Sequence, residues 1–436
     1  MPDSSKVSCS QVLAGNLLLL MLAVAIARAI WPHTFPVWMS GAISWLAFLL
    51  LIRKLHPNHL RLSAIIASIG ILLIGWGMRQ GAALPFDDIL SKNVPLLTLL
   101  VGISYLRWVM PNGNLDRHQG GGAMRLLQST MIAHLFASVI NLSAIFIVID
   151  GSHGCDAARK HYIIPIARAY GAAAFWSPFF VAMGVALTYA PEAKVHHLMI
   201  LGIPTALLTL LITVLEHRLR HKEGNISIPD YPVTLSTLMV PVTLIAGVLI
   251  VHILASGYPI ILIVAGLCVT ISVLDGFRDH HHSFVRHTHT FAPMMGGELA
   301  LFLSAGIMAA GIQVVVGSTD ISFLGTITGI SFYVTLFLMM LIAAMIGVHP
   351  VISISTVGTI LGTHGNNDLL GAVFLLVWGL GIIGGPLSGL NLSLQTRYGL
   401  EPLKLFKDQL PFIIVMMLLS PMILKLYSLI LDFMNS

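Results

Sequence analysis

The chain has 436 residues, of which 56% are hydrophobic and only 9% are charged. A soluble domain carries about 25% charged residues, so this composition excludes one and predicts an all-α polytopic membrane protein. The formal net charge of +5 fits basic cytoplasmic loops and indicates no nucleic-acid partner. The three cysteines lie far apart, which predicts neither a disulfide framework nor a metal site.

A membrane-spanning helix needs about 20 mostly apolar residues. Clear candidates in chain order are residues 12–30, 36–52, 62–78, 94–110, 172–190, 197–215, 232–256, 259–275, 370–394 and 411–433. Three further apolar stretches are harder to divide: 124–149, 291–316 and 321–362. Together they predict roughly 10 to 13 transmembrane segments. No A-x-A-like cleavage site follows the first run, which is therefore interpreted as a retained helix.

Basic side chains predict the orientation of several loops. Segments 53–61, 107–125, 216–231 and 395–409 all hold Lys or Arg and should be cytoplasmic. Segment 150–169 is also basic. It lies in the cytoplasm only if 124–149 enters the membrane and returns to the same side as a re-entrant hairpin. The alternative is one ordinary spanning helix, followed by an external charge cluster.

Short matches indicate an internal repeat. "LFAS" at 135–138 recurs as "LFLS" at 301–304, and "GS" at 151–152 recurs at 317–318. These matches keep the same order and spacing. The predicted organisation is therefore N-terminal transmembrane helices in 1–93, a first repeat in 94–231, a second repeat in 232–410 and a C-terminal helix in 411–436.

Two prolines interrupt long apolar segments at Ser177-Pro178 and His349-Pro350. Proline removes a backbone donor, so a proline inside a membrane helix frees polar groups that need other partners. Broken helices at corresponding places of two repeats are the best sequence pointer to a transporter binding site. We therefore predict that these four residues bind substrate; plain proline kinks are the alternative.

Further polar side chains extend this predicted site. Ser353, Ser355 and Thr356 follow the second proline, while Asn141 and Asn391 each lie in an S-x-x-N-x-S pattern within apolar sequence. Polar groups at membrane depth need protein, water or ligand as partners. All five are predicted to contact substrate, although bonds within their own helices would also satisfy the hydroxyls.

Two titratable residues are candidates for ion coupling. His349 can take up a proton near physiological pH. Glu298 stands at the start of an apolar run, where it could be a proton or cation ligand or simply a favourable charge at a helix start. We expect no resident cofactor or metal, with Na⁺ or H⁺ as the coupling ion. One loop is rich in histidine and could either bind a metal cluster or be a solvated cytoplasmic loop. Its histidines are His280, His281, His282, His287 and His289.

The two repeats, the hairpin and the prolines at the breaks resemble the ion transporter superfamily. That superfamily includes divalent anion:sodium symporters, arsenite antiporters and the large permease subunits of tripartite transporters. The resemblance covers most of the chain after residue 94, in architecture more than in motif. It implies an elevator-type secondary transporter. The chain lacks the Ser-Asn-Thr triplet of the dicarboxylate branch and a pair of buried aspartates.

We therefore expect a permease of the inner (cytoplasmic) membrane and not an enzyme. Its partners should be the lipid bilayer and a small organic or inorganic anion, because hydroxyls, Asn and broken-helix ends suit carboxylates and oxyanions. A proton or sodium gradient should drive transport, and a homodimer is the expected candidate assembly. The alternatives are a membrane-integral metal enzyme using loop 280–289 and a permease subunit that needs a periplasmic binding partner.

Overall fold

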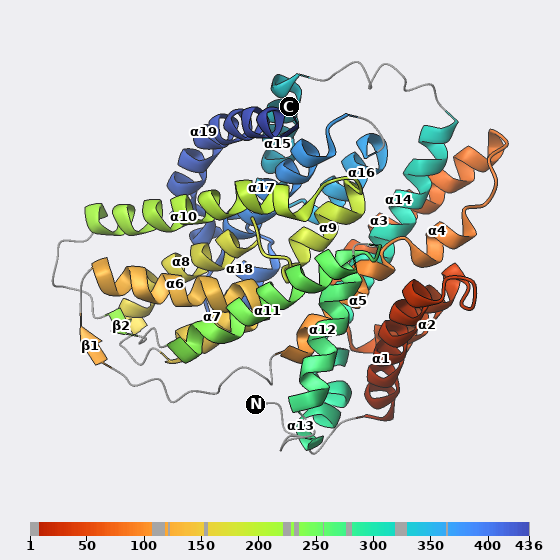
Figure 1. Ribbon diagram of the computed structural model, residues 1–436, viewed down its shortest axis with the longest axis horizontal. Coiled ribbons are helices and arrows are strands. Elements are labelled where there is room, and N and C mark those ends of the chain that lie inside the picture. Colours follow the sequence, from red (N-terminus) through yellow and green to blue (C-terminus); the bar gives the residue numbers. More distant parts are fainter. Residues whose placement is uncertain are drawn as a thin grey trace. The chain divides into compact units, whose positions relative to one another are not determined.

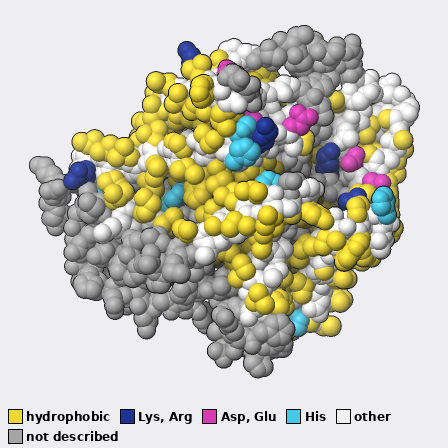
Figure 2. All heavy atoms as spheres, viewed as in Figure 1, with side chains coloured by type: hydrophobic (Ala, Val, Ile, Leu, Met, Phe, Trp, Pro, Cys, Tyr) yellow, Lys and Arg dark blue, Asp and Glu magenta, His cyan; other side chains and the backbone are white. Residues whose placement is uncertain are grey.

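The computed structural model describes residues 8–106, 118–120, 123–151, 156–220, 228–230, 235–255, 257–275, 281–318, 329–362 and 365–435. This described chain is helical apart from one pair of three-residue strands (Figure 1). By length and composition, seven of its helical stretches can cross a membrane. The face shown in Figure 2 is largely hydrophobic and carries few charged side chains. The predicted class of all-α polytopic membrane protein is confirmed.

The chain divides into two compact units. Unit 1 comprises residues 1–110, 246–324 and 355–363, and unit 2 comprises residues 111–245, 325–354 and 364–436. Each unit combines segments from both predicted repeats. A compact unit and a sequence repeat are different properties, so the division into repeats at 94–231 and 232–410 stays a prediction.

Unit 1 contains the N-terminal helices and a set from the middle of the chain. Its elements are α1 (Cys9–Ile30), α2 (Val37–Leu51), η2 (Ile52–Lys54), α3 (Pro57–Arg79), α4 (Phe86–Ser91), α5 (Val94–Tyr105), α12 (Ile260–Asp275), α13 (His281–Arg286), the π-helix η5 (His287–Phe291), η6 (Ala292–Met295) and α14 (Gly296–Gly317).

Glycines allow α3 and α14 of unit 1 to pack closely against each other. A Cβ atom at Gly70 would lie 2.6 Å from the Met308 nitrogen, and one at Gly311 would lie 2.5 Å from the Gly70 carbonyl oxygen. Such backbone approach is common between membrane helices, because small residues let van der Waals packing hold them together.

Unit 2 contains most of the predicted site. Its elements are β1 (His118–Gly120), α6 (Ala123–Ile140), α7 (Ser143–Gly151), α8 (Asp156–Ala173), α9 (Val181–Tyr189), α10 (Val195–Arg220), β2 (Ile228–Asp230), α15 (Ile330–Met345), α17 (Asn367–Gly384), α18 (Gly389–Tyr398) and α19 (Pro402–Asn435). Two further helices, α11 (Leu235–Leu254) and α16 (Pro350–Leu361), have residues in both units.

Helix α17 is the core of unit 2. All its residues from Leu369 to Gly384 are buried, and α8, α9, α10, α15 and α19 pack against it. Its N-terminus is capped by Asn366, whose side chain accepts a hydrogen bond from the Leu369 N–H at 3.0 Å. A helix that is apolar on every side is expected at such a central position.

The two short strands bear on the predicted orientation. β1 pairs antiparallel with β2, and His118 lies opposite Asp230. These strands belong to segments 107–125 and 216–231, both of which were placed in the cytoplasm because of their positive charge. Pairing requires the two segments to lie on the same side of a membrane, which agrees with that prediction.

The predicted boundaries were wrong around residue 170. Segment 150–169 was expected to be a hydrophilic loop, but from Asp156 onward it forms α8. Arg168 is buried there: it forms an ion pair with Glu216 of α10, donates to Gln409 of α19 and lies over the Phe412 ring. Paired charges can be buried inside a helical unit, so a basic residue did not mark a loop. The span predicted at 172–190 is interrupted between α8 and α9.

Candidate functional site

The apolar stretch 124–149 folds as two helices joined by a turn. Helix α6 ends at Ile140 and α7 begins at Ser143. Between them, Asn141 adopts a positive φ of 52°, a conformation that Asn tolerates better than most residues. Helix α7 has nine residues, and a membrane crossing needs about 20. A re-entrant hairpin requires two short helices of this kind. Whether segment 124–149 returns to the same side of the membrane stays a prediction.

The next two helices are separated by an irregular break at 174–180. Here Pro178 has no backbone N–H, and the Ser177 hydroxyl accepts the Phe179 N–H at 3.1 Å. The same hydroxyl donates to the Ser138 carbonyl at the end of α6. From the turn, the Asn141 amide donates to the Phe179 carbonyl at 3.2 Å. Hydrogen bonds thus join turn and break into one structure, here called the first turn–break pair.

The buried side chain of His134 in α6 links the first break to α8 by two hydrogen bonds. Trp176 donates its Nε1–H to Nε2 of His134 at 3.0 Å, so the other ring nitrogen must carry the proton of a neutral imidazole. That Nδ1–H donates to the Ala169 carbonyl at 3.0 Å. Both nitrogens of His134 are therefore used. Sequence reasoning missed this residue, although a His in the middle of an apolar run was a visible signal.

A second turn and a second break follow later in unit 2. Helix α15 ends at Met345, and the turn at 346–349 contains Gly347 with a φ of +104° before α16 begins. The break at 385–388 separates α17 from α18. Pro350 lies against Gly381, where a Cβ atom would be 3.0 Å from the proline Cγ. These elements are called the second turn–break pair.

Ring and side-chain packing also join the second pair. The ring of His349 lies edge-on to that of Trp378 in α17, with centroids 5.7 Å apart. Leu387 from the break lies beside Gly347 in the turn, where a Cβ atom would be 3.0 Å from its Cδ1. The opening turn of α16 and the end of α17 are therefore in direct contact.

Asn391 closes the second break from inside. Its amide donates to the carbonyls of Gly385 at 2.8 Å and Ile383 at 3.4 Å, where α17 ends. Its own N–H donates to the hydroxyl of Ser388, the N-cap of α18. The side-chain oxygen of Asn391 is buried and has no partner among the described residues. Asn391 is thus a cap for backbone carbonyls, and its role in substrate binding stays a prediction.

The two pairs meet on α17. A Cβ atom at Gly379 would lie 2.3 Å from the Phe175 ring of the first break and 3.0 Å from the Gly171 carbonyl oxygen of α8. The neighbouring Trp378 contacts His349 of the second turn. One helix therefore carries the second break and touches the first.

The order of elements in α6 to α9 recurs in α15 to α18. Helices of 18, 9, 18 and 9 residues (α6 to α9) are followed later by helices of 16, 12, 18 and 10 residues (α15 to α18). In both sets a turn separates the first two helices and a break separates the last two. Ser177-Pro178 lies in a break, whereas His349 ends a turn and Pro350 begins α16. The prediction that the two prolines occupy equivalent positions was therefore wrong.

The predicted site residues are divided between the units. Unit 2 holds Asn141, Ser177, Pro178, His349, Pro350, Ser353 and Asn391. Unit 1 holds Glu298, Ser355 and Thr356. The structure therefore brings the first group together in one compact body.

In unit 1, several polar residues have ordinary structural surroundings. Glu298 lies exposed in the first turn of α14, with the ring of His59 beside the preceding Gly297. The His-rich segment was predicted as a loop, but from His281 onward it is helical, in α13 and η5. His287 bonds to Ser104, and His289 bonds to Asn16. Among the described residues no group of three His, Cys, Asp or Glu side chains could hold a metal. His280 lies outside the described residues.

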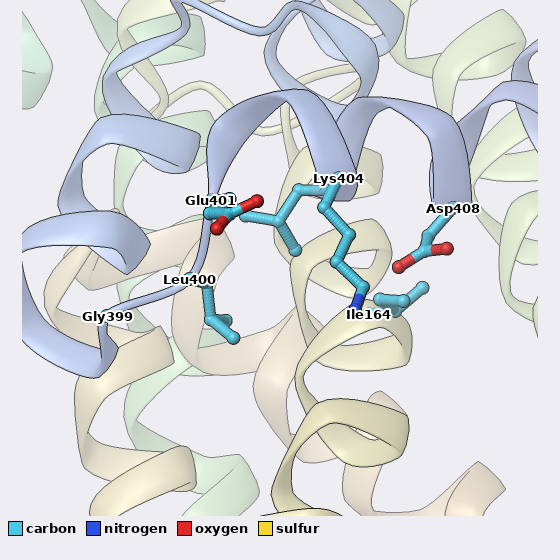
Figure 3. A pocket seen from close by; sticks show the side chains of 7 residues that line it. Ile164, Gly399, Leu400, Glu401, Lys404 and Asp408 are labelled. Carbon is cyan, nitrogen blue, oxygen red and sulfur yellow. The ribbon is translucent and has the colours of Figure 1, made fainter.

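Two surface cavities are lined by residues that do not belong to the turn–break pairs. The first, of about 120 Å³, lies in unit 2 between α8 and the start of α19, where Lys404 extends between Glu401 and Asp408 (Figure 3). The second, of about 430 Å³, is lined in unit 1 by residues such as Asp88 and Gln313 and is open to solvent. A pocket for a small organic ligand usually has 300 to 1,000 Å³, so the first is too small for one.

No protein-family model and no curated protein sequence matches the chain. Among solved structures, the YdaH transporter of Alcanivorax borkumensis, described as having an unusual topology, is similar with a TM-score of 0.53 and 14% sequence identity. The likeness covers 84% of this chain and 98% of that one. At this identity it shows the fold: the chain is similar in architecture to a membrane transporter.

Proposed function

We propose that the chain is a secondary active transporter that moves a small organic or inorganic anion across the cytoplasmic membrane. The observation that carries this proposal is the presence of two turn–break pairs in one compact unit, both in contact with α17. Interrupted helices at membrane depth line binding sites in transporters, because irregular backbone is tolerated there only beside protein, water or ligand. The fold likeness to a transporter supports transport over the metal-enzyme alternative.

The preference for an anion rests on the helix ends. Helices α9 and α18 both begin at a break, and a helix N-terminus presents N–H groups and a partial positive charge. Ser388 caps α18, whereas no side chain caps α9 at its N-cap residue, Phe180. Phe180, Ala182 and Met183 at the start of α9 are buried, and the Met183 N–H donates to the Phe180 carbonyl at 3.0 Å. The N–H groups of Val181 and Ala182 also need acceptors. A carboxylate or oxyanion would supply them.

The residues proposed to contact substrate are those of the turn–break pairs: Asn141, Ser177, Pro178, His349, Pro350, Ser353 and Asn391. Ser355 and Thr356 of α16 complete the predicted set. A proton or sodium gradient would drive transport, with His349 and Glu298 as the coupling residues proposed from sequence. Membership of the ion transporter superfamily, an elevator-type mechanism and assembly as a homodimer belong to the same proposal.

The test is uptake by proteoliposomes across a panel of carboxylates and oxyanions, with and without proton and sodium gradients. Pro178→Ala and Pro350→Ala should both impair uptake of the accepted solute while membrane insertion stays intact, because each proline fixes one member of a pair. Pro421→Ala is the matched control, since this proline lies inside α19 and outside both pairs. Normal uptake by both site variants would leave only ordinary kinks.

A further inference from the structure

Outside the turn–break pairs, the start of α10 and the start of α17 are joined by an ionisable contact. Nδ1 of His197 lies 2.8 Å from Oδ2 of Asp368, and the side chains are only 5% and 14% exposed. The other carboxyl oxygen of Asp368 accepts the Lys194 N–H at 2.7 Å. One carboxylate thus binds two donors from the first turn of α10.

Asp368 is the second residue of α17 and lies at the positive end of that helix. An ionised Asp368 can only accept, so Nδ1 of His197 must carry a hydrogen. A neutral His197 then has its second nitrogen, Nε2, without a hydrogen, and that atom can accept a further proton.

Both helix starts contribute charge to this contact. His197 lies in the first turn of α10, near the positive end of that helix. It is in direct contact with Asp368, and a hydrogen bond between two charged groups is stronger than one with a neutral donor. A protonated His197 would therefore bind Asp368 more strongly than a neutral one.

Other ionisable groups surround this contact. On the α10 side, Lys194 and His196 have exposed side chains, and the His196 ring lies 4.5 Å from that of His197. From α19, the buried hydroxyl of Tyr427 lies within the electrostatic influence of Asp368. From α15, the Tyr333 hydroxyl accepts the Asn366 N–H just before α17. His197 is the partner that forms an ion pair with Asp368 among the described residues.

We infer that His197 and Asp368 form a proton-binding site whose protonation strengthens the contact between α10 and α17. Helix α17 carries the second break and contacts the first, so a proton bound here acts on the helix that holds both pairs. The consequence for transport rests on the proposed function; the binding of the proton does not.

A double-mutant cycle of thermal stability tests proton binding without transport. The purified chain and the variants His197→Gln, Asp368→Asn and the combination are melted in detergent at pH 8 and pH 5.5. Gln can still donate to Asp368 but cannot titrate, so the fold should be kept. The coupling is the part of the double variant's shift in melting temperature that the two single shifts do not add up to. It should be at least twice as large at pH 5.5 as at pH 8, because His197 then carries a positive charge opposite Asp368. Equal coupling at both pH values would overturn the inference.

If Asp368→Asn does not yield folded protein, the difference in melting temperature between the parent and His197→Gln is followed from pH 8 to pH 5.5. It should grow as the pH falls, and a constant difference would overturn the inference. His196→Gln is the matched control, because it removes an adjacent histidine that is exposed; its difference from the parent should stay constant.

Uptake tests the consequence for transport. The initial rate in the parent should change severalfold between pH 5.5 and pH 8, and by less than twofold in His197→Gln. His196→Gln should follow the parent. A parent that transports no solute of the panel would refute the proposed function and leave the stability test intact. A parent profile retained by His197→Gln would refute the link between this site and transport.

Discussion

The two turn–break pairs of unit 2 differ in the interactions that hold each turn against its break. In the first pair, side chains bond across the gap: Ser177 to the Ser138 carbonyl and Asn141 to the Phe179 carbonyl. In the second pair, close packing joins turn and break, with Pro350 seated on Gly381. Asn391 bonds within its own break.

The comparison shows two separate requirements of an interrupted helix in an apolar environment. Freed backbone groups must find partners, and the loose ends must be held in place. The first pair meets both demands with the same hydrogen bonds. The second meets them separately, through Asn391 for the carbonyls and through small-residue packing for position. The second pair should therefore be sensitive to side-chain volume and the first to loss of polar atoms.

The largest expected effect is from Gly381→Leu. A Cβ atom there already lies 3.0 Å from Pro350 and 3.2 Å from the Cβ of Ala344, so a larger side chain must push the second turn away from α17. Overpacking costs about 1–3 kcal/mol and occasionally more, and uptake should be abolished. Gly389→Ala is the control, because its Cβ would meet nothing within 4 Å. Unchanged melting and uptake in Gly381→Leu would show that the second pair is not held by packing.

Ser177→Ala should have the next largest effect. It removes the donor to the Ser138 carbonyl and the acceptor of the Phe179 N–H in a fully buried place. Leaving buried partners unsatisfied costs about 1–3 kcal/mol, which should lower the melting temperature and impair uptake. The control is Ser428→Ala, whose hydroxyl bonds to Lys425 on an exposed surface. Equal stability of both variants would contradict the hydrogen-bonded account of the first pair.

Two substitutions of Asn141 separate its side chain from its backbone. Asn141→Gly keeps the positive φ and loses only the bond to Phe179, at a cost of about 1 kcal/mol. Asn141→Ala loses the same bond and should be about 1–2 kcal/mol less stable than the Gly variant, because Ala keeps the Cβ that crowds the following carbonyl and, unlike Asn, has no polar group to bond locally. Thermal melting should rank the parent above Gly and Gly above Ala. If Ala is as stable as Gly, the left-handed turn is not a constraint.

Ser353→Ala should have the smallest effect on stability. Its hydroxyl donates to the Pro350 carbonyl within the same turn of α16, so no bond between elements is lost. Apparent affinity for the transported anion should still weaken severalfold, since a lost hydrogen bond costs on the order of 1 kcal/mol. Thr335→Ala is the control, because it loses a similar bond within exposed α15. Unchanged affinity would remove Ser353 from the substrate site.

Much of the fold follows from hydrophobic run length and proline position. The runs at 12–30, 197–215 and 411–433 correspond to α1, α10 and α19, because long apolar runs must be helical in lipid. The sequence also located a proline in the first break, Pro178, and one at the end of the second turn, Pro350. It could not distinguish a break from a turn, because Pro178 and Pro350 remove the same backbone donor in both.

Other features needed tertiary information. Arg168 belongs to a buried ion pair with Glu216, and these residues are 48 positions apart in the chain. The contact of His197 with Asp368 spans 171 positions. The visible signals were a His-His pair before one apolar run and an Asp at the start of another. Neither signal identifies its partner, because pairing depends on which helices pack together.

The central claim is that the turn–break pairs of unit 2 hold the transported solute. The most direct measurement is the labelling rate of a single cysteine at Ser353, in a background without Cys9, Cys155 and Cys268. The anion identified by the uptake panel should slow labelling at this position severalfold and leave a cysteine at Thr335 unaffected. Equal labelling of the Ser353 cysteine with and without the anion, in protein that still transports, would contradict the account.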